Sequence, residues 1–481
     1  MPLTKRLLRS LAAWASLGLL AARVSAQNVQ TLHSFSGLQN GTNQDGAAPV
    51  CTLVLLGNSL YGTATGGGFS GNGIMFAIRT DGTGFTNLHN FTGDDGSGPW
   101  SELTLSGQTL YGTAQSGGSG GGGTVFCVNL DGSGFTNLYN FPSGDALGAG
   151  HPIGPLVLSS NLLYGATLAG GIFVNGTLFG LQTNGDAFTN FFTFTGGADG
   201  GYPSSLIFSN DVLYGTSFGG SASSGGVFMV PTGGGTFGGL DFIHNFMGPD
   251  GSGSRIGLAL SSNVLYGTTF AGGANDAGTI FALSIDGSGF STLHGFTDVT
   301  LVNSDPSGLL HGTNADGFDS EGPLLLSGNT LYGTTLTGGG SGNGTVFAIN
   351  TDGTGFTNLH VFSPLVMNTN QDGANPKGGL VLAGNALYGT TLQGGAFGNG
   401  TVFRIPIPSA QPELTINLSA GFAVLNWATN FTGFLPQYAT NLIPPVTWNP
   451  VSSPVVVVNG LNWVTNVISA SEQYFRLRAV R

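Results

Sequence analysis

The chain has 481 residues, of which only 7% are charged, and its acidic residues outnumber its basic ones by 23 to 11. Nucleic acids and anionic lipids both need clustered Lys or Arg, so this balance excludes phosphate-rich partners and leaves neutral glycans, cations and proteins. Hydrophobic residues make up 40% of the chain, and 86 residues are glycine. The composition therefore predicts a folded, turn-rich, all-β protein, and its length exceeds that of one small domain.

The first 26 residues differ from the rest of the chain. Lys5, Arg6 and Arg9 form a basic start, Leu11 to Ala22 an apolar run, and Val24-Ser25-Ala26 a cleavage site of small residues. The apolar run is shorter than the roughly 20 residues of a membrane-spanning helix, which favours a secretory signal peptide at 1–26 over a membrane anchor. Its removal takes away four of the 11 basic residues and leaves a net charge of −16. We expect a secreted or cell-surface protein with no transmembrane segment.

Two cysteines, Cys51 and Cys127, are present. Export would permit a disulfide between them. They occupy different positions of the repeat described next, which favours two separate thiols over a bond.

A repeat of about 50 residues runs along most of the chain. Its clearest mark is a Leu-Tyr-Gly triplet, which begins at Leu60, Leu110, Leu163, Leu213, Leu265, Leu331 and Leu387. Each copy predicts four strands; in the sixth copy these are Leu324 to Leu326, Leu331 to Leu336, Gly344 to Phe347 and Phe356 to Phe362. A glycine loop joins the second and third strands, and Asp352-Gly353 forms the last hairpin.

The last copy lacks a fourth strand, because the chain runs from its third strand into Pro406 and Pro408. A matching strand stands instead at Gln30 to Phe35. If this strand completes the last copy, the array closes into a ring without exposed sheet edges. We therefore predict a seven-bladed β-propeller at 27–408, closed by its N-terminal strand. The alternative is a β-helix or other open solenoid, which has no reason to keep an isolated fourth strand at its start.

The repeat stops after Pro408, and residues 409–481 have a different composition. Three Trp residues stand there, together with apolar or alternating runs at Phe422 to Trp427, Val455 to Val458 and Tyr474 to Val480. This pattern predicts a small C-terminal β-sandwich-like domain.

The repeated unit "LYGTT..GG...GTVF.IN.DG.GFTNLH.F" resembles the GloVer tandem repeat, over Gln30 to Ile407. That repeat occurs in secreted bacterial proteins with varied C-terminal anchoring segments. The resemblance implies an exported, propeller-like repeat domain and a C-terminal attachment region, and it carries over no catalytic residues. Tyr139 and Phe192 stand where other copies have a fourth-strand His, a variation that structural positions tolerate.

Five copies share a fourth-strand histidine: His33, His89, His244, His294 and His360. One metal ion needs several ligands at about 2.0 to 2.2 Å, whereas the outer strands of a ring hold equivalent side chains far apart. We expect each His to be hydrogen-bonded within its own blade. The glycine loops lead into strands and contain no Lys, so they are not phosphate loops.

The connections between copies carry most of the acids and, from the strand order, all leave the ring at one end. Function tends to lie on loops held by a rigid scaffold and in its concave openings. The alternative for these side chains is simple loop packing. The candidate ligand-binding residues are Trp100, His151, Tyr202, His311, Asp316, Asp319 and Glu321.

The stretch "NTNQDG", Asn368 to Gly373, begins like a calcium loop, with Asn368, Asn370 and Asp372 as ligands. Gly379 stands where the completing Glu of such a loop would be. The alternative is a turn capped by its own side chains. Calcium is thus a candidate ligand, and no cofactor is required.

The sequence favours a non-catalytic, monomeric binding module for a neutral glycan, a cation or a protein at the cell surface. One alternative is a carbohydrate-active hydrolase or lyase that uses two carboxylates about 5 to 9.5 Å apart, such as Asp316 or Asp319 with Glu321. Nearly every connection has an acid, so no pair stands out. A further alternative is a structural or adhesive surface protein.

Overall fold

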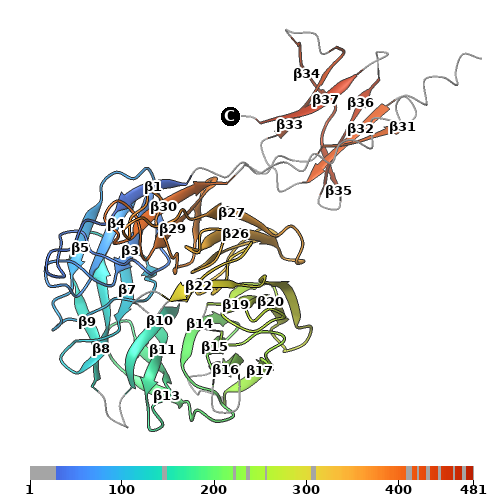
Figure 1. The fold of residues 1–481 in the computed structure, drawn as a ribbon. Coiled ribbons are helices and arrows are strands. Elements are labelled where there is room, and N and C mark those ends of the chain that lie inside the picture. The colour runs from blue at the N-terminus through green and yellow to red at the C-terminus, as the bar shows by residue number, and fades with distance from the viewer. Residues whose placement is uncertain are drawn as a thin grey trace, which may run out of the picture. The chain divides into compact units, whose positions relative to one another are not determined.

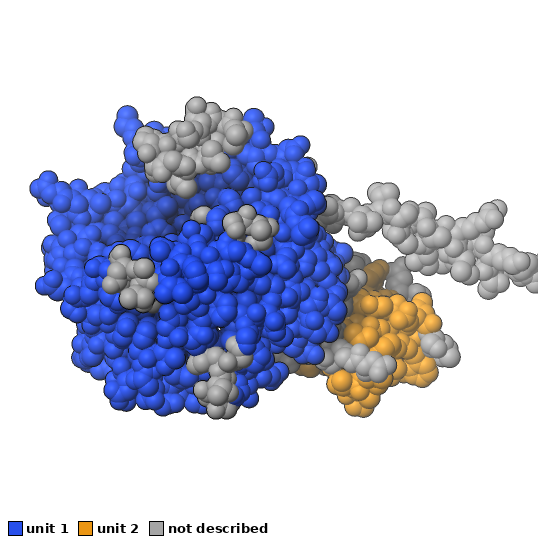
Figure 2. All heavy atoms as spheres, turned by 90° about the horizontal axis from the view of Figure 1, so that it is seen from below, with its two compact units in different colours: residues 1–407 blue, residues 408–481 orange. Residues whose placement is uncertain are grey.

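The computed structural model describes residues 29–143, 149–219, 224–233, 239–254, 257–304, 310–407, 414–419, 422–428, 434–441, 446–458, 461–468 and 473–479. The predicted signal peptide lies outside the described residues. The chain forms two compact units (Figure 2), which we call the repeat region, Met1–Ile407, and the C-terminal region, Pro408–Arg481. The regular elements of the described residues are all β-strands, which confirms the all-β prediction (Figure 1). Among these residues no helix is long and apolar enough to span a membrane.

The described part of the repeat region contains seven four-stranded antiparallel sheets. Repeats 1 to 3 are β2 (Val54–Leu56), β3 (Ser59–Ala64), β4 (Ile74–Arg79), β5 (Thr86–Asn90); β6 (Thr104–Ser106), β7 (Thr109–Ala114), β8 (Gly121–Asn129), β9 (Thr136–Pro142); and β10 (Ala149–Ser159), β11 (Leu162–Gly170), β12 (Thr177–Gln182), β13 (Thr189–Thr193). Repeats 4 and 5 are β14 (Pro203–Ser209), β15 (Val212–Ser217), β16 (Gly226–Pro231), β17 (Asp241–Asn245); and β18 (Ala259–Ser261), β19 (Val264–Thr269), β20 (Thr279–Ser284), β21 (Ser291–Gly295).

The last two repeats follow a short extra hairpin. This hairpin, β22 (Thr300–Ser304) with β23 (Leu310–Thr313), lies in the connection from repeat 5 to repeat 6. Repeat 6 is β24 (Leu325–Ser327), β25 (Thr330–Thr335), β26 (Thr345–Asn350) and β27 (Thr357–Val361). Repeat 7 joins β28 (Val381–Ala383), β29 (Ala386–Thr391) and β30 (Thr401–Pro406) to β1 (Gln30–Ser34).

The sheets follow one another around a common centre, and the blue β1 lies beside the orange β30 (Figure 1). β1 pairs antiparallel with β30, with Thr31 opposite Phe403. The next residue after this strand, Phe35, is fully buried in the core between repeats 7 and 1. The first strands lie innermost, because they contact the first strands of neighbouring repeats, as β2 contacts β28.

The Leu-Tyr-Gly triplet recurs because its glycine has no room for a side chain. In every repeat a Cβ at this glycine would lie 2.3 to 2.7 Å from a Phe ring on the third strand, as at Gly62 against Phe76. The seven Phe residues are fully buried. The triplet is therefore a packing motif: Leu and Phe fill the space between sheets, and Gly lets them meet.

The outer-strand histidines donate from Nε2 to an Asp carboxylate in the connection that follows, at 2.8 to 3.0 Å. We call these pairs the His–Asp clasps: His33–Asp45, His89–Asp95, His244–Asp250, His294–Asp316 and His360–Asp372. Each of these histidines is hydrogen-bonded, as expected, but the partner Asp lies in the link to the next repeat and not within the blade itself. Each clasp ties an outer strand to the link that leaves it.

The same histidine rings also join neighbouring repeats. In four clasps the imidazole stacks on a Phe of the next repeat, with ring centroids 3.6 to 3.9 Å apart. Tyr139, which replaces His in repeat 2, stacks on Phe188 in the same way at 3.8 Å. The fourth-strand position of the clasp histidines and Tyr139 therefore holds a flat ring that stacks on the next repeat. Where that ring is His, it also makes the hydrogen bond of the clasp.

The C-terminal region has two sheets, described here by themselves. One has the order β31 (Thr415–Ser419), β32 (Phe422–Ala428), β36 (Leu461–Val467), β35 (Val456–Val458), and the other β34 (Asn449–Pro450), β33 (Phe434–Ala439), β37 (Tyr474–Ala479). Leu425, Trp427 and Val464 of the first sheet pack with Phe475 and Leu477 of β37, so the two sheets share one apolar core.

Candidate functional site

The connections enter the innermost strands through the same backbone turn in all seven repeats. One residue of this turn has a left-handed φ of 54 to 64°. In six repeats its carbonyl oxygen accepts a hydrogen bond from the residue after the second strand, as between Gln115 N and Gly98 O at 3.0 Å; in repeat 3 the residue, His151, lies within β10. The residues at this left-handed position are Ala48, Gly98, His151, Tyr202, Gly253, Asp319 and Asn375.

Two large side chains stand at this left-handed position, although glycine occupies it in two other repeats. Any residue with a Cβ is strained at such a φ, and bulky residues are rare there. His151 and Tyr202 accept that strain, with a φ of 54° each. Strain kept at a place where the same fold accepts glycine is typical of functional positions.

A second set of equivalent positions lies two residues further on. We call it the inner ring; its described members are Val50, Trp100, Ile153, Ser204, Glu321 and Lys377. No two of these six are the same residue type, whereas the packing positions of the repeat barely vary. The inner ring therefore varies from repeat to repeat.

Part of the inner ring lines a cavity of about 390 Å³, which we call the mouth pocket. Trp100 and Tyr202 face it with 37% and 40% of their surfaces exposed. Phe218 and Leu168 add apolar surface, and the polar lining comes from Gln115, Ser204, Glu321 and Lys377. The structure thus brings together three of the predicted candidates: Trp100, Tyr202 and Glu321.

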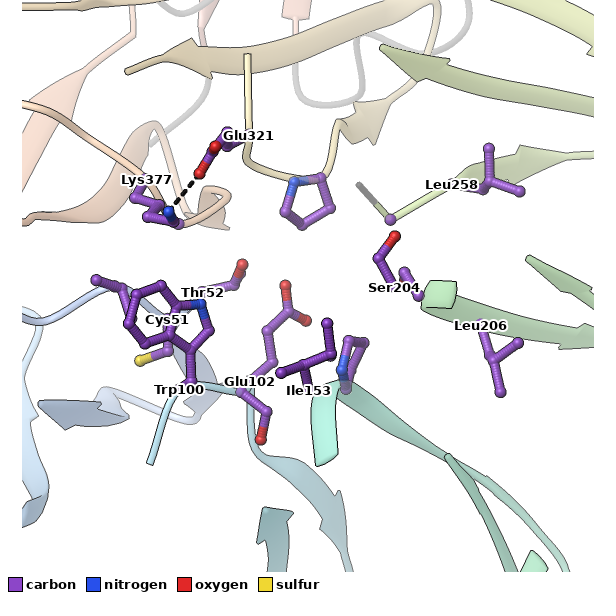
Figure 3. Close-up of a pocket in the computed structure, with 18 of the residues that line it drawn as sticks. Cys51, Thr52, Trp100, Glu102, Ile153, Ser204, Leu206, Leu258, Glu321 and Lys377 are labelled. Atoms are coloured by element: carbon purple, nitrogen blue, oxygen red, sulfur yellow. Dashed lines mark ion pairs between the residues drawn. The ribbon is translucent and has the colours of Figure 1, made fainter. Parts of the chain in front are cut away.

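Lys377 organises one side of the mouth pocket. Its Nζ lies 2.5 Å from Glu321 Oε2 (dashed in Figure 3) and 4.9 Å from the centre of the Trp100 ring. An ammonium over the face of an indole is an attractive cation–π contact. Trp100 and Glu321 come from different repeats, so this one side chain holds both in place.

A second cavity of about 200 Å³, the floor pocket, adjoins the mouth pocket and shares Trp100, Ile153 and Glu321 with it. Glu102 lines the floor pocket, and its carboxyl group points into the space (Figure 3). Burial raises the pKa of Glu102, and a hydrogen bond from the Thr52 hydroxyl offsets part of that rise. Cys51 also lines this pocket, with its thiol buried and not disulfide-bonded.

Sequence reasoning missed Glu102 and gave Lys377 no binding role. Glu102 lies two residues before β6 and was not considered in the sequence analysis. A signal was available, because the equivalent residues of the other repeats carry no charge: Thr52, Pro155, Ser205, Gly257, Pro323 and Gly379. Lys377 needed the ring geometry, since its partner Trp100 is distant in the sequence.

Asp316 lies apart from the mouth pocket. It is buried, accepts a hydrogen bond from His294 Nε2 at 2.8 Å and caps Thr297. Burial raises the pKa of Asp316, but the hydrogen bonds from His294 and Thr297 outweigh it and hold the pKa below its usual value. Asp316 therefore serves a clasp.

The remaining predicted ligand-binding residues have different surroundings. His151 Nδ1 donates to the carbonyl oxygen of Gln115 at 3.2 Å, beside the mouth pocket. Asp319 occupies the left-handed position, and its carbonyl oxygen accepts from Leu336 N at 2.8 Å. His311 belongs to β23, and its side chain lies outside the described residues.

The predicted calcium ligands form a self-capped turn. Asn370 Nδ2 donates to the carbonyl oxygens of Ser363 and Gly373, and its Oδ1 accepts from the N–H groups of Gly373 and Gly395, at 2.7 to 3.0 Å. Asp372 is bound to His360, and Asn368 has a left-handed φ of 66°. Within the described residues, no group of three or more His, Cys, Asp or Glu side chains is placed to hold a metal ion.

Repeated four-stranded antiparallel sheets around a centre define a propeller-like, all-β tandem-repeat protein. The chain belongs to the Gloeobacter/Verrucomicrobia repeat family, whose model matches residues 21–228 and 216–424. This confirms the resemblance found in the repeat itself. No curated protein matches the chain.

Several solved structures are distantly similar to the chain. An oligogalacturonate lyase in complex with manganese is 12% identical, with 80% of this chain and 94% of that chain covered and a TM-score of 0.47. A gluconolactonase from Xanthomonas campestris is 13% identical, with 81% of this chain and 93% of that chain covered and a TM-score of 0.39. A puromycin-hydrolyzing peptidase of Mycobacterium tuberculosis is 10% identical, with 82% of this chain and 62% of that chain covered and a TM-score of 0.46. At these values the likenesses say nothing of what this chain binds or does.

Proposed function

We propose that the chain is a secreted, non-catalytic, seven-bladed β-propeller that binds a neutral polysaccharide in the mouth pocket. The C-terminal region would be a small β-sandwich that serves attachment or recognition at the cell surface. The observation that carries the proposal is the pair of exposed aromatic rings, Trp100 and Tyr202, at one pocket of a chain with few charges.

The chemistry of the mouth pocket suits a sugar. The C–H face of a pyranose ring is apolar and packs on an aromatic ring, while its hydroxyls need hydrogen-bonding groups at the edge. Trp100, Tyr202 and Phe218 offer such rings, and Gln115 and Ser204 offer the polar edge. The strained φ of Tyr202 supports the same conclusion, because the fold has no need of a large side chain there.

The propeller part of the proposal rests on the seven sheets and on the pairing of β1 with β30. A ring of this kind has no open sheet edge between its first and last repeats. It also holds seven variable connections at one end, around a single opening. A binding protein can change those connections without changing its scaffold.

The second candidate is a carbohydrate-active hydrolase or lyase. It is favoured by the two carboxyl groups of Glu102 and Glu321 in adjoining pockets. Against it, Glu321 is paired with Lys377, and Asp316 is engaged by His294. Release of oligosaccharide from a polysaccharide, abolished in Glu102→Gln or Glu321→Gln, would establish the enzyme and overturn the binding proposal.

The test begins with thermal-shift measurements on the chain from Gln27 onward, across a panel of neutral polysaccharides, with and without calcium. A polysaccharide that raises Tm is then titrated calorimetrically against the wild type and two variants. Trp100→Ala should weaken binding at least about tenfold, and Phe69→Ala should leave it unchanged. Phe69 is a matched control, because it is also an exposed aromatic residue, at 67%, but does not line the mouth pocket. Equal affinities in the two variants would contradict the proposal, and no shift with any glycan would favour a structural or adhesive surface protein.

Calcium is tested in the same screen. We propose it as a ligand only at Asn368 to Gly373. Asn368 is not part of a His–Asp clasp, so its substitution leaves the clasp of Asp372 intact. A calcium-induced rise in Tm that is lost in Asn368→Ala would place the ion there. No rise would leave the stretch as a self-capped turn.

A further inference from the structure

Two polar groups that line the floor pocket make fewer hydrogen bonds than they could. Ser205 is 5% exposed, and its Oγ has no hydrogen-bond partner among the described residues. The carboxyl group of Glu102 receives one side-chain hydrogen bond, from Thr52, although a carboxylate accepts about four. Both groups line the same cavity of about 200 Å³. Buried polar groups are normally paired, so the unpaired Ser205 hydroxyl, at the cavity that also holds the singly bonded Glu102 carboxyl group, needs an explanation.

The fold itself does not require polar groups at these places. Glu102 and Ser205 occupy the same position of the repeat, because each directly precedes the buried Leu that packs against the triplet glycine, Leu103 and Leu206. Pro155 and Pro323 hold the equivalent position in other repeats, and Gly257 and Gly379 do so as well. Since apolar residues satisfy the same backbone there, the carboxyl and hydroxyl groups are surplus to folding and cost stability.

The position of the two groups relative to the mouth pocket gives them a use. The floor pocket shares Trp100, Ile153 and Ser204 with the mouth pocket, so the two cavities adjoin. A sugar ring stacked on Trp100 would carry hydroxyls at its edge, and Trp100 also lines the floor pocket. Figure 3 shows the Glu102 carboxyl group aimed into this space from below.

We propose that Glu102 and Ser205 form the hydrogen-bonding floor of the ligand site and bind adjacent hydroxyls of a glycan unit whose ring stacks on Trp100. This inference rests on the proposed function and specifies which groups recognise the sugar. The carboxylate of Glu102 accepts from two neighbouring hydroxyls, and Ser205 Oγ donates to, or accepts from, a third. Bidentate acceptance by a carboxylate fixes the orientation of a diol.

The proposal predicts a direction of pH dependence. Burial raises the pKa of Glu102 in the free protein, and hydroxyls that donate to its ionised form lower that pKa on binding. Affinity must therefore rise with pH through the titration of Glu102, with release of protons. The other titratable groups that line this pocket among the described residues are Cys51, whose pKa burial raises, and the ion pair of Glu321 with Lys377.

The experiment is calorimetric titration with soluble neutral oligosaccharides of glucose, xylose, mannose and galactose, at several pH values from 4 to 8. We compare the wild type with Glu102→Gln, Ser205→Ala and Trp100→Ala, each first shown to melt cooperatively. Glu102→Gln and Ser205→Ala should each lose about tenfold in affinity. Glu102→Gln should also lose the rise of affinity with pH and the proton release.

The outcomes separate this inference from the function beneath it. If Trp100→Ala abolishes binding while Glu102→Gln keeps wild-type affinity and pH dependence, the floor proposal is overturned and glycan binding stands. If the wild type binds none of these oligosaccharides, both are overturned. If Ser205→Ala alone is unchanged, the floor consists of Glu102 only, and the two-residue form of the proposal is wrong.

Discussion

The outer strands and the inner ring both recur in every repeat, but their residues differ in how much they vary. The outer-strand residue is nearly constant, and the inner-ring residue changes from repeat to repeat. At the outer position five repeats have His in a clasp with Asp, and repeat 2 keeps a stacked ring as Tyr139. At the inner ring the six described residues are all different. The fold repeats what it needs in each copy, so the positions that differ between copies of one chain are free for a ligand.

The largest effect should come from removing β1, which completes repeat 7. Deletion of the chain up to Phe35 would expose the edge of β30 and remove a fully buried Phe from the core. We expect the truncated chain to lose its cooperative melting transition, as measured by circular dichroism. A chain starting at Gln27 should keep the transition. A peptide covering Gln27 to Gly37 should restore the transition. Cooperative melting of the truncated chain at an unchanged Tm would show that the ring does not depend on β1.

A clasp variant should destabilise less than the loss of β1. Asp372→Asn removes an acceptor of His360 Nε2 and Ser363 N, and we expect a cost of about 2 kcal/mol in the free energy of unfolding at pH 7. Burial raises the pKa of Asp372, but hydrogen bonds from His360 and Ser363 outweigh it, so the folded pKa is lowered. The stabilisation is thus present above the unfolded pKa of about 3.9 and is lost as pH falls through the folded value.

Urea unfolding at pH 7 and near pH 3 checks this expectation. Tyr139→Phe is the control, since that repeat has a stacked ring and no clasp, and its cost should stay within about 0.5 kcal/mol. A cost for Asp372→Asn that is the same at both pH values would show that the ionised carboxylate is not what stabilises the link.

Glu102→Gln should act in the opposite direction to the clasp variant. Because burial raises the folded pKa of Glu102, the wild type loses stability as pH rises from the unfolded value through the folded one. The variant has no charge to bury, so we expect it to be more stable than the wild type by about 1 kcal/mol at pH 8. The difference should vanish near pH 4. A variant that is less stable at pH 8 would assign Glu102 a structural role.

The smallest effect is expected at the left-handed position. Tyr202→Gly relieves the strain of a φ of 54°, and we expect a gain of up to about 1 kcal/mol, offset in part by lost contacts of the ring. The same variant should weaken glycan binding. Tyr202→Ala serves as the comparison, because it removes the ring and keeps the Cβ strain. If Tyr202→Gly and Tyr202→Ala lose the same stability, the backbone at this position is not strained.

Local chemistry explains what could be predicted from the sequence. The triplet, the Asp-Gly hairpins and the fourth strands depend on neighbours in the chain, so the strands and the sheets follow from them. The family membership followed from the same residues. Trp100, Tyr202 and Glu321 were found because large or charged residues stood out in glycine-rich links.

Contacts that depend on ring closure could not be predicted in this way. The clasp partners are separated by 6, 12 or 22 residues, depending on the length of the link. No fixed spacing therefore marked Asp316 as the partner of His294 rather than as a ligand-binding acid. Lys377 meets Trp100 and Glu321 only because the ring brings distant repeats around one opening.

A crystal structure of the complex tests the central claim most directly. The oligosaccharide that gives the largest rise in Tm would be soaked into crystals of the chain from Gln27 onward. The account predicts a sugar ring stacked on Trp100, beside Tyr202, with hydroxyls on Glu102 and Ser205. A ligand bound on the outer strands or on the C-terminal region, with the mouth pocket empty, would contradict it.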